Sequence, residues 1–368
     1  MSIFNQSQKA YLLLADGTVF EGRSFGAEGT AMGEVVFTTS VIGYQETLTD
    51  PGNFGMIVTQ TFPLIGNYGV NDEDFESPKA TVSGYVAREW CNTPSNFRSK
   101  DNINDFMKQQ NVIGIHSIDT RCLTRIIRES GVMNAMITTE NVYEKKDELL
   151  KQLSEYKSAN AVKSVTCKEN KVYSCENSKY KVAMFDFGCK NSLLNELLQR
   201  NCEVTVVPAF TTPQQIKDMN VDGIMLSNGA GDPMENPEII ENIKEIASFG
   251  IPMMGVCTGH QILALSQGAK TEKMKYGHRG GNQPVVDVNL GKTFVTMQNH
   301  GYVVLSDSIS SEIGTISHVN ANDKSCEGIR YSNINAISVQ FLPESHGGRQ
   351  DTGYMVDEFV EMMEKEMH

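Results

Sequence analysis

Residues 255–260, Gly-Val-Cys-Thr-Gly-His, could carry nucleophilic chemistry. A cysteine with glycines two residues before and two residues after it has the spacing of a nucleophile elbow, with cysteine in place of serine. Such a turn would place the Cys257 thiol at the start of a helix, where the helix dipole and free N–H groups favour the reactive thiolate. The alternative is a buried cysteine in an ordinary turn between a strand and a helix.

A glycine-rich segment precedes this candidate elbow. Residues 227–233 read Ser-Asn-Gly-Ala-Gly-Asp-Pro and follow a predicted strand. In a parallel sheet this loop would lie beside Cys257, so that the backbone N–H groups of Gly229 and Thr258 could stabilise an oxyanion. A phosphate-binding loop is the alternative, but the sequence contains neither GxxxxGK[ST] nor GxGxxG.

A nucleophilic cysteine also needs a general base. His260 would point along the predicted helix and is expected to be structural. The later candidates are His278, His300, His318 and His346. His300 lies in the polar cluster 298–302, Gln-Asn-His-Gly-Tyr, which suits recognition of an amide or an α-amino acid; a solvated turn is the alternative.

The elements that must position these residues alternate between strand and helix. Strands are predicted over 181–188, 203–209, 223–231 and 251–256. Helices are predicted over 192–200, 212–220, 236–250 and from 258 onward. Asn191 or Ser192 is expected to cap the first of these helices. This order predicts a parallel sheet with helices on both faces. Ligands bind such sheets at the carboxyl ends of the strands, where Cys257 and Gly229 fall.

The N-terminal half has a different pattern. Short β-like runs come first and helical stretches follow, which predicts a mixed α/β domain. Residues 143–180 are rich in lysine and glutamate and poor in large apolar residues. We therefore expect an N-terminal domain over 1–150, a linker over 151–179 and a C-terminal domain over 180–368.

Composition excludes several classes of protein. The 368 residues carry 32 Lys+Arg against 45 Asp+Glu, a net charge of −13, which disfavours nucleic acid and anionic membranes as partners. No apolar run approaches the roughly 20 residues of a membrane span, and the start does not resemble a signal peptide. The 8 cysteines form no CxxC pair. We expect a cytoplasmic protein with reduced thiols and no metal site.

The motifs together resemble those of a known family. Residues 255–261, residues 227–233 and a late Pro-Glu after a strand are similar to the triad-type glutamine amidotransferases. The N-terminal half narrows the resemblance to the small subunit of carbamoyl phosphate synthase. The N-terminal segments that match this subunit are residues 40–46, 49–51, 65–67, 95–98 and 119–125. In the C-terminal half, residues 185–188, 277–278 and 280–282 match it as well. The resemblance covers nearly the whole chain except the linker and the tail.

The resemblance implies an α/β fold, with a C-terminal class I glutamine amidotransferase-like domain and an N-terminal small-subunit domain. It implies that glutamine is hydrolysed through a thioester and that ammonia passes to a large synthetase subunit. That partner would use bicarbonate, ATP and Mg to make carbamoyl phosphate for arginine or pyrimidine biosynthesis, and no cofactor would be bound by this chain.

The resemblance also implies roles for individual residues. Cys257 matches the nucleophile, Glu344 matches the acid that orients the catalytic histidine, and Gly229 and Thr258 match the oxyanion-binding amides. The glutamine-binding positions are Ser40, Gly231, Gln261, Asn299, Gly301 and Tyr302, with Gln298 beside them.

One member of the family's pattern is missing. The family reads Gln-Gly-His-Pro-Glu, whereas residues 340–344 read Gln-Phe-Leu-Pro-Glu, so that Leu342 stands where the base should be. Leucine cannot transfer a proton, and loss of general acid–base catalysis costs roughly 10²–10⁴ in rate. His346 would lie about 6 Å further along a helix axis, too far to be a good replacement.

The sequence therefore predicts an amidotransferase subunit with weakened glutamine hydrolysis. Two alternatives stay open. The chain could be a catalytically dead glutamine-binding or scaffold subunit of an ammonia-dependent synthase. It could also be a separate cysteine hydrolase of γ-glutamyl substrates, although such a hydrolase would not need the N-terminal domain.

Overall fold

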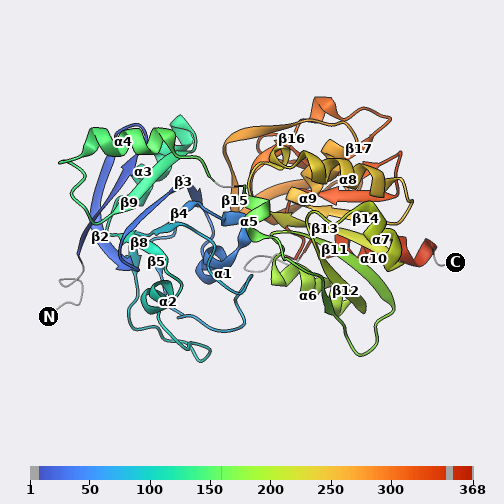
Figure 1. Ribbon diagram of the computed structural model, residues 1–368, viewed down its shortest axis with the longest axis horizontal. Helices are drawn as coiled ribbons and strands as arrows, with labels where there is room; N and C mark the ends of the chain where they lie inside the picture. Colours follow the sequence, from blue (N-terminus) through green and yellow to red (C-terminus); the bar gives the residue numbers. More distant parts are fainter. Residues whose placement is uncertain (1–7, 159, 345–350, 367–368) are drawn as a thin grey trace. The chain divides into compact units, whose positions relative to one another are not determined.

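The computed structural model describes residues 8–158, 160–344 and 351–366, which form two compact units, Met1–Ala159 and Asn160–His368 (Figure 1). The segment 151–179, expected as a linker, contains the end of α4 (Lys146–Glu155) in the first unit. It also contains α5 (Ala161–Val165) and β10 (Lys171–Tyr173) in the second. Within the described ranges, no helix is long and apolar enough to cross a membrane.

The first unit is built around a closed barrel, which the sequence analysis did not foresee. Its strands, in spatial order, are β1 (Lys9–Leu14), β2 (Val19–Gly26), β8 (Ile113–His116), β6 (Gly84–Val86), β4 (Ile57–Gln60), β3 (Thr30–Thr38) and β9 (Met133–Thr138). The β3–β4, β4–β6 and β6–β8 pairs are parallel and the others are antiparallel. A small second sheet pairs β5 (Leu64–Ile65) with β7 (Glu89–Trp90).

Helices complete this unit as the mixed α/β prediction requires. They are α1 (Tyr44–Thr49), α2 (Ile103–Gln109), α3 (Thr120–Ser130) and α4. In α3 the Asp119 side chain accepts the backbone N–H of Cys122 at 2.9 Å, a standard N-cap. Leu123 and Ile127, one helical turn apart, are both fully buried, which explains how this helix attaches to the unit.

The second unit contains a ten-stranded sheet. Its parallel part consists of β12 (Cys202–Pro208), β11 (Tyr180–Phe187), β13 (Gly223–Gly229), β14 (Met253–Val256) and β19 (Ala336–Val339). Beyond β19 the sheet continues antiparallel through β18 (Cys326–Tyr331), β17 (Gly314–Asn320), β15 (Thr271–Asp287) and β16 (Lys292–Val304). β10 pairs antiparallel with β12 at the other end.

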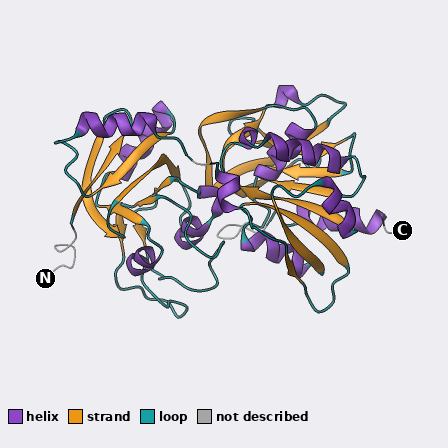
Figure 2. Ribbon diagram, in the orientation of Figure 1, coloured by secondary structure: helices purple, strands orange, loops and turns teal. Residues whose placement is uncertain are grey.

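Helices cover both faces of this sheet, which confirms the predicted layers (Figure 2). α7 (Pro213–Met219), α8 (Pro237–Ala247) and α9 (Thr258–Ser266) pack into the cluster that contains Ala183 and Phe185 of β11. α6 (Asn191–Gln199) and α10 (Tyr354–Glu366) pack into the cluster that contains Val182 and Met184. Because neighbouring residues of a strand point to opposite faces, the two sets of helices lie on opposite sides.

One local prediction was wrong, and one alternative is excluded. Helix α6 begins directly after Lys190 and has no side-chain cap, so neither Asn191 nor Ser192 caps it. Residues 298–302 do not form a turn, since they lie inside β16, where Gln298, Asn299 and His300 pair with β15.

Candidate active site

The predicted strand–turn–helix around Cys257 is confirmed. Cys257 joins β14 to α9 with φ 54° and ψ −106°, a region that costs a non-glycine residue about 1–3 kcal/mol. A Cβ on Gly255 would lie 2.8 Å from the carbonyl oxygen of Gly259, and a Cβ on Gly259 would lie 2.1 Å from that of Leu226. Both glycines are therefore required by the close approach of the helix to the sheet.

The glycine-rich loop leaves the sheet next to this turn. β13 pairs in parallel with β14, with Leu226 opposite Gly255, so both strands present their carboxyl ends at the same edge. A Cβ on Gly229 would lie 2.4 Å from the Phe187 carbonyl oxygen, and Gly231 has φ +78°. The structure thus brings the predicted oxyanion loop and the elbow to one edge of the sheet, as expected.

Phe341 and Leu342, which precede Pro343 and Glu344, are apolar and buried. Leu342 is 1% exposed and belongs to the same apolar cluster as Cys257. Its backbone N–H donates to the Met297 carbonyl oxygen at 2.9 Å. The Phe341 ring packs edge-on against His318, with ring centroids 5.3 Å apart. A leucine side chain offers no proton donor or acceptor here.

Glu344 is held by a lysine. Its Oε1 lies 2.9 Å from Nζ of Lys190, and the two side chains are only 0% and 3% exposed. The Lys190 backbone N–H donates to Oδ1 of Asn228, and the Asn228 amide donates to the Gly188 carbonyl oxygen. Lys190 thus reaches Glu344 from the loop after β11.

Lys190 is the buried charge that the sequence analysis missed. Nothing in the spacing of Phe-Asp-Phe-Gly-Cys-Lys marks this lysine as different from a surface one. The available signal was topological, since the loop after a central parallel strand ends at the same sheet edge as Cys257.

One face of β16 meets the thiol. The Sγ atom of Cys257 lies 3.6 Å from the Asn299 carbonyl oxygen. Three residues further, the Tyr302 carbonyl oxygen accepts the side-chain amide of Gln261 at 2.8 Å, and the same amide donates to Oε1 of Gln340 at 3.0 Å. Asn299 therefore lies beside Cys257, and Tyr302 is joined to Gln261 in the helix that follows Cys257.

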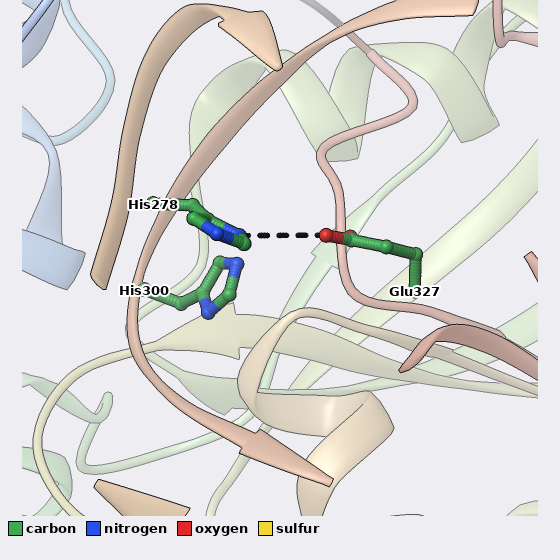
Figure 3. Close-up of side chains that lie close together, drawn as sticks. All are labelled: His278, His300 and Glu327. Atoms are coloured by element: carbon green, nitrogen blue, oxygen red, sulfur yellow. Dashed lines mark ion pairs between the residues drawn. The ribbon is translucent and has the colours of Figure 1, made fainter. Parts of the chain in front are cut away.

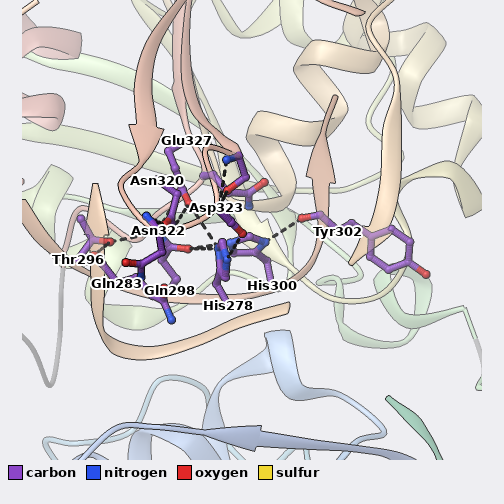
Figure 4. Close-up of polar contacts among 12 residues, drawn as sticks. His278, Gln283, Thr296, Gln298, His300, Tyr302, Asn320, Asn322, Asp323 and Glu327 are labelled. Atoms are coloured by element: carbon purple, nitrogen blue, oxygen red, sulfur yellow. Dashed lines mark hydrogen bonds and ion pairs between the residues drawn. The ribbon is translucent and has the colours of Figure 1, made fainter. Parts of the chain in front are cut away.

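The other face of β16 carries a buried polar network (Figure 4). Oε1 of Gln298 lies 3.1 Å from Nδ1 of His278 and 2.9 Å from Nε2 of His300. The Gln298 amide nitrogen donates to Oε2 of Glu327 at 2.9 Å and to the Thr296 hydroxyl at 3.1 Å. Gln298 is fully buried, so its side chain is occupied within this network.

The two histidines of the network differ in charge. Burial lowers the tendency of His278 to hold a proton, but hydrogen bonds to Asp323 and Glu327 outweigh it and raise the His278 pKa to about 9. Burial, together with the charge of His278, holds the pKa of His300 well below its ordinary value. His278 is therefore an imidazolium at neutral pH and His300 is neutral.

His278, His300 and Glu327 could in principle hold a metal ion. Their ligand atoms lie within 4.8 Å of one another, and two histidines with a carboxylate suit zinc (Figure 3). However, His278 faces a carboxylate at each ring nitrogen, and the Gln298 amide oxygen lies within 3.1 Å of both imidazoles. A proton on His278 satisfies this geometry, and we assign no metal to it.

The other residues singled out in the sequence are Ser40, Gly301, His260 and His346. Ser40 belongs to the first unit, where its carbonyl oxygen accepts the Gln60 side-chain amide. Gly301 lies in β16, where an added Cβ would be 3.0 Å from Nη2 of Arg279. His260 is fully buried, with Nδ1 2.7 Å from the Ser338 hydroxyl, a structural contact. His346 lies outside the described residues.

Comparison with known proteins agrees with this arrangement. Residues 12–137 match the family described as "Carbamoyl-phosphate synthase small chain, CPSase domain", and residues 183–362 match "Glutamine amidotransferase class-I". The carbamoyl phosphate synthase small chain of Syntrophotalea carbinolica is 44% identical over 375 residues, covering 97% of this chain and 98% of that protein. Those of Bacillus cereus (44% over 356 residues, 97% and 96%) and Listeria monocytogenes (43% over 365 residues, 98% and 99%) are similar.

Proposed function

Because this chain belongs to the family of carbamoyl phosphate synthase small chains, we propose that it binds glutamine and hydrolyses its side-chain amide slowly through a Cys257 thioester. The observation that carries the proposal is the elbow itself. A strained cysteine at a helix N-terminus lies beside the backbone of β16, with its Sγ 3.6 Å from the Asn299 carbonyl oxygen.

The reaction would proceed in two steps. The Cys257 thiolate attacks the amide carbonyl carbon, and the backbone N–H groups of Gly229 and Thr258 stabilise the oxyanion. The C–N bond then breaks, and the nitrogen takes up a proton and leaves as ammonia. Water attacks the thioester, giving glutamate and regenerating the thiol. Both steps need a proton carrier, and Leu342 cannot serve as one, which is why we propose slow turnover.

Substrate recognition would fall mainly to residues of the second unit. Gln261, Asn299, Gly301 and Tyr302 are supported by their place next to Cys257 or on β16, and Gly231 by its place in the neighbouring loop. The role of Ser40 in binding glutamine is supported by the family motif alone. Gln298 would not contact glutamine, because its side-chain amide is occupied by buried partners. It would contribute by holding β16 in place.

Ammonia would pass to a large synthetase subunit, which supplies the ATP, Mg and bicarbonate chemistry of carbamoyl phosphate synthesis in the cytoplasm. The first unit offers a candidate docking feature. Phe97 is 95% exposed, while the neighbouring Arg98 is fixed to Asp74 at 3.1 Å and Glu73 at 3.0 Å. An exposed aromatic on a braced loop is typical of a residue that a partner buries.

A second candidate function is favoured by the packing around Leu342. A leucine that is 1% exposed in a well-packed cluster is what a catalytically dead, glutamine-binding subunit of an ammonia-dependent synthase would carry. The third possibility, a separate γ-glutamyl hydrolase, has no observation in its favour, because the small-chain family matches residues 12–137.

Turnover of glutamine by the purified chain separates the first two. We expect slow glutamate release that is abolished by Cys257→Ala. A rate indistinguishable from that of Cys257→Ala, with glutamine still bound, would favour the catalytically dead subunit. Absence of both turnover and binding would contradict the proposal.

A further inference from the structure

We propose that the outer face of helix α3, which carries Arg121, Arg125 and Arg128, docks onto an acidic surface of the large synthetase subunit. We call these three residues the arginine face. The inference rests on the proposed function, because that function requires a synthetase partner. It adds a charged contact to the apolar one proposed at Phe97.

The arginine face lies away from the side by which the helix attaches to its unit. Leu123 and Ile127 of α3 are fully buried, and the helix packs against β3 and β4 of the barrel. Arg121, Arg125 and Arg128 are all exposed. Because residues three and four positions apart are neighbours on a helix surface, the three side chains leave α3 on one side.

The charges of the arginine face are not compensated within the protein. α3 contains one acidic residue, Glu129, and across the described residues no ion pair joins the arginine face to a carboxylate. Arginines elsewhere do have acidic partners. The pairs are Arg98 with Asp74, Arg200 with Asp357 and Arg330 with Glu358. The arginine face is therefore a local concentration of positive charge on a chain whose net charge is −13.

The spacing of the arginine face does not favour the stability of the helix. Arg121 lies in the first turn, where the positive end of the helix dipole disfavours a cation. Arg121 and Arg125 are four positions apart and Arg125 and Arg128 are three apart, and like charges at these spacings repel each other. A face that served only to keep the helix in solvent would gain from acidic residues at these positions. The arrangement thus favours a role in binding.

The dimensions and sign of the arginine face indicate what it binds. From Arg121 to Arg128 the helix rises about 10 Å, which is more than one phosphate or carboxylate group can bridge. An extended anionic surface fits this length. Nucleic acid is such a surface, but the net charge of the rest of the chain would repel it. An acidic protein surface that meets only this face avoids that repulsion, since charge complementarity orients the encounter.

The place of α3 in the chain indicates which acidic protein this is. The helix lies within residues 12–137, which match the small-chain domain, and outside residues 183–362, which match the glutamine amidotransferase domain. Glutamine hydrolysis is assigned to the second of these domains. A charged surface confined to the first domain therefore suits the subunit that receives the ammonia.

The experiment measures binding of the full chain to the cognate large subunit by surface plasmon resonance. The variant combines Arg121→Gln, Arg125→Gln and Arg128→Gln, which removes the charges and keeps long polar side chains. We expect its dissociation constant to be at least about tenfold higher than that of the parent at about 50 mM salt, mainly through slower association. At about 500 mM salt the difference should shrink to about twofold or less, because ions screen the charges.

Two controls accompany the variant. Lys79→Gln, Lys244→Gln and Lys365→Gln together remove the same net charge from three separate exposed sites, and should leave the dissociation constant within about twofold of the parent. The midpoint of urea unfolding of the arginine variant should equal or exceed that of the parent, because repulsion between like charges has been removed.

Several results would overturn the inference. They are an unchanged dissociation constant, an equal loss in the lysine control, a loss that is the same at both salt concentrations, and a lower unfolding midpoint. Calorimetry that finds one inorganic phosphate bound to the parent and none to the arginine variant would assign the face to a small anion instead. If the parent itself does not bind the large subunit, the proposed function fails as well, whereas normal binding by both proteins contradicts this inference alone.

Discussion

Nζ of Lys190 and Oε1 of Glu344 lie 2.9 Å apart in a site that excludes solvent from both side chains. The family resemblance assigns Glu344 to orient a histidine, and position 342 holds leucine instead. The carboxylate nevertheless has a cationic partner, which compensates its charge in the buried site. The pair with Lys190 thus compensates the buried carboxylate in a site where position 342 is leucine.

Replacing Lys190 by Met should strongly destabilise the protein. Removing one partner of a buried ion pair leaves an uncompensated charge and typically costs about 3–5 kcal/mol. The free energy of unfolding, measured in urea, should fall by that order in Lys190→Met and by less in Lys190→Met with Glu344→Gln. The matched control is Lys9→Met, which breaks the exposed pair with Glu21 and should change stability far less, because solvent screens that pair. Equal losses in Lys190→Met and Lys9→Met would contradict a buried ion pair.

Glutamine should still bind although the base is absent. Phe341 stands where the family pattern has glycine, but its ring packs against His318 inside the core and does not need to enter the pocket. Calorimetry on Cys257→Ser should therefore detect binding, and Gln261→Leu should weaken it because the amide contact to Tyr302 is lost. No detectable heat at millimolar glutamine would show that the pocket is blocked.

Stability should depend on pH in opposite senses for different histidines. Burial lowers the pKa of His260 to about 3 and that of His318 to about 4. Both histidines are neutral in the folded protein at neutral pH. Their contribution to the free energy of unfolding is therefore complete above the unfolded pKa of about 6.5 and is lost as pH falls toward 4. The raised pKa of His278, about 9, contributes stability that is complete below about 6.5 and is lost as pH rises through 9.

His278→Gln isolates the alkaline part of this profile. The parent should lose on the order of 3 kcal/mol more than the variant between about pH 6.5 and pH 9. Urea unfolding across this range measures the difference. Parallel stability curves for the two proteins would show that His278 does not carry a raised pKa.

Phe97→Asp should weaken association with the large synthetase subunit. Hot-spot aromatics contribute about 2 kcal/mol or more to an interface, so we expect at least roughly a thirtyfold increase in the dissociation constant. Sedimentation velocity of the mixed subunits would measure it. Leu290→Asp, at an apolar position that is 54% exposed on the second unit, is the control and should have little effect. An unchanged dissociation constant for Phe97→Asp would place the interface elsewhere.

The sequence was most informative where backbone geometry leaves few choices. The glycines around Cys257 and the alternation of strands and helices over 181–266 predicted the elbow and the layers correctly, because local sterics and periodicity decide both. The barrel of the first unit was not predicted, because it closes through the pairs β1–β9, β2–β8 and β3–β9, which join strands that lie far apart in the chain.

The polar partners were the least predictable part of the site. The Lys190–Glu344 pair joins residues 154 positions apart, and the His278–Glu327 contact joins β15 to β18. No periodic pattern relates such residues. The polar cluster 298–302 was read as a possible turn because its composition is that of a turn, whereas buried partners on one face make it part of a strand.

The most direct test of the account compares glutamine-dependent with ammonia-dependent carbamoyl phosphate synthesis by the complex with the cognate large subunit. The parent complex should use ammonia well and glutamine poorly. Leu342→His should raise the glutamine-dependent rate at least roughly tenfold, because an imidazole next to Cys257 and Glu344 restores proton transfer, and should leave the ammonia-dependent rate unchanged. A parent complex that uses glutamine as fast as ammonia, and gains nothing from Leu342→His, would contradict the claim that the missing base limits this enzyme.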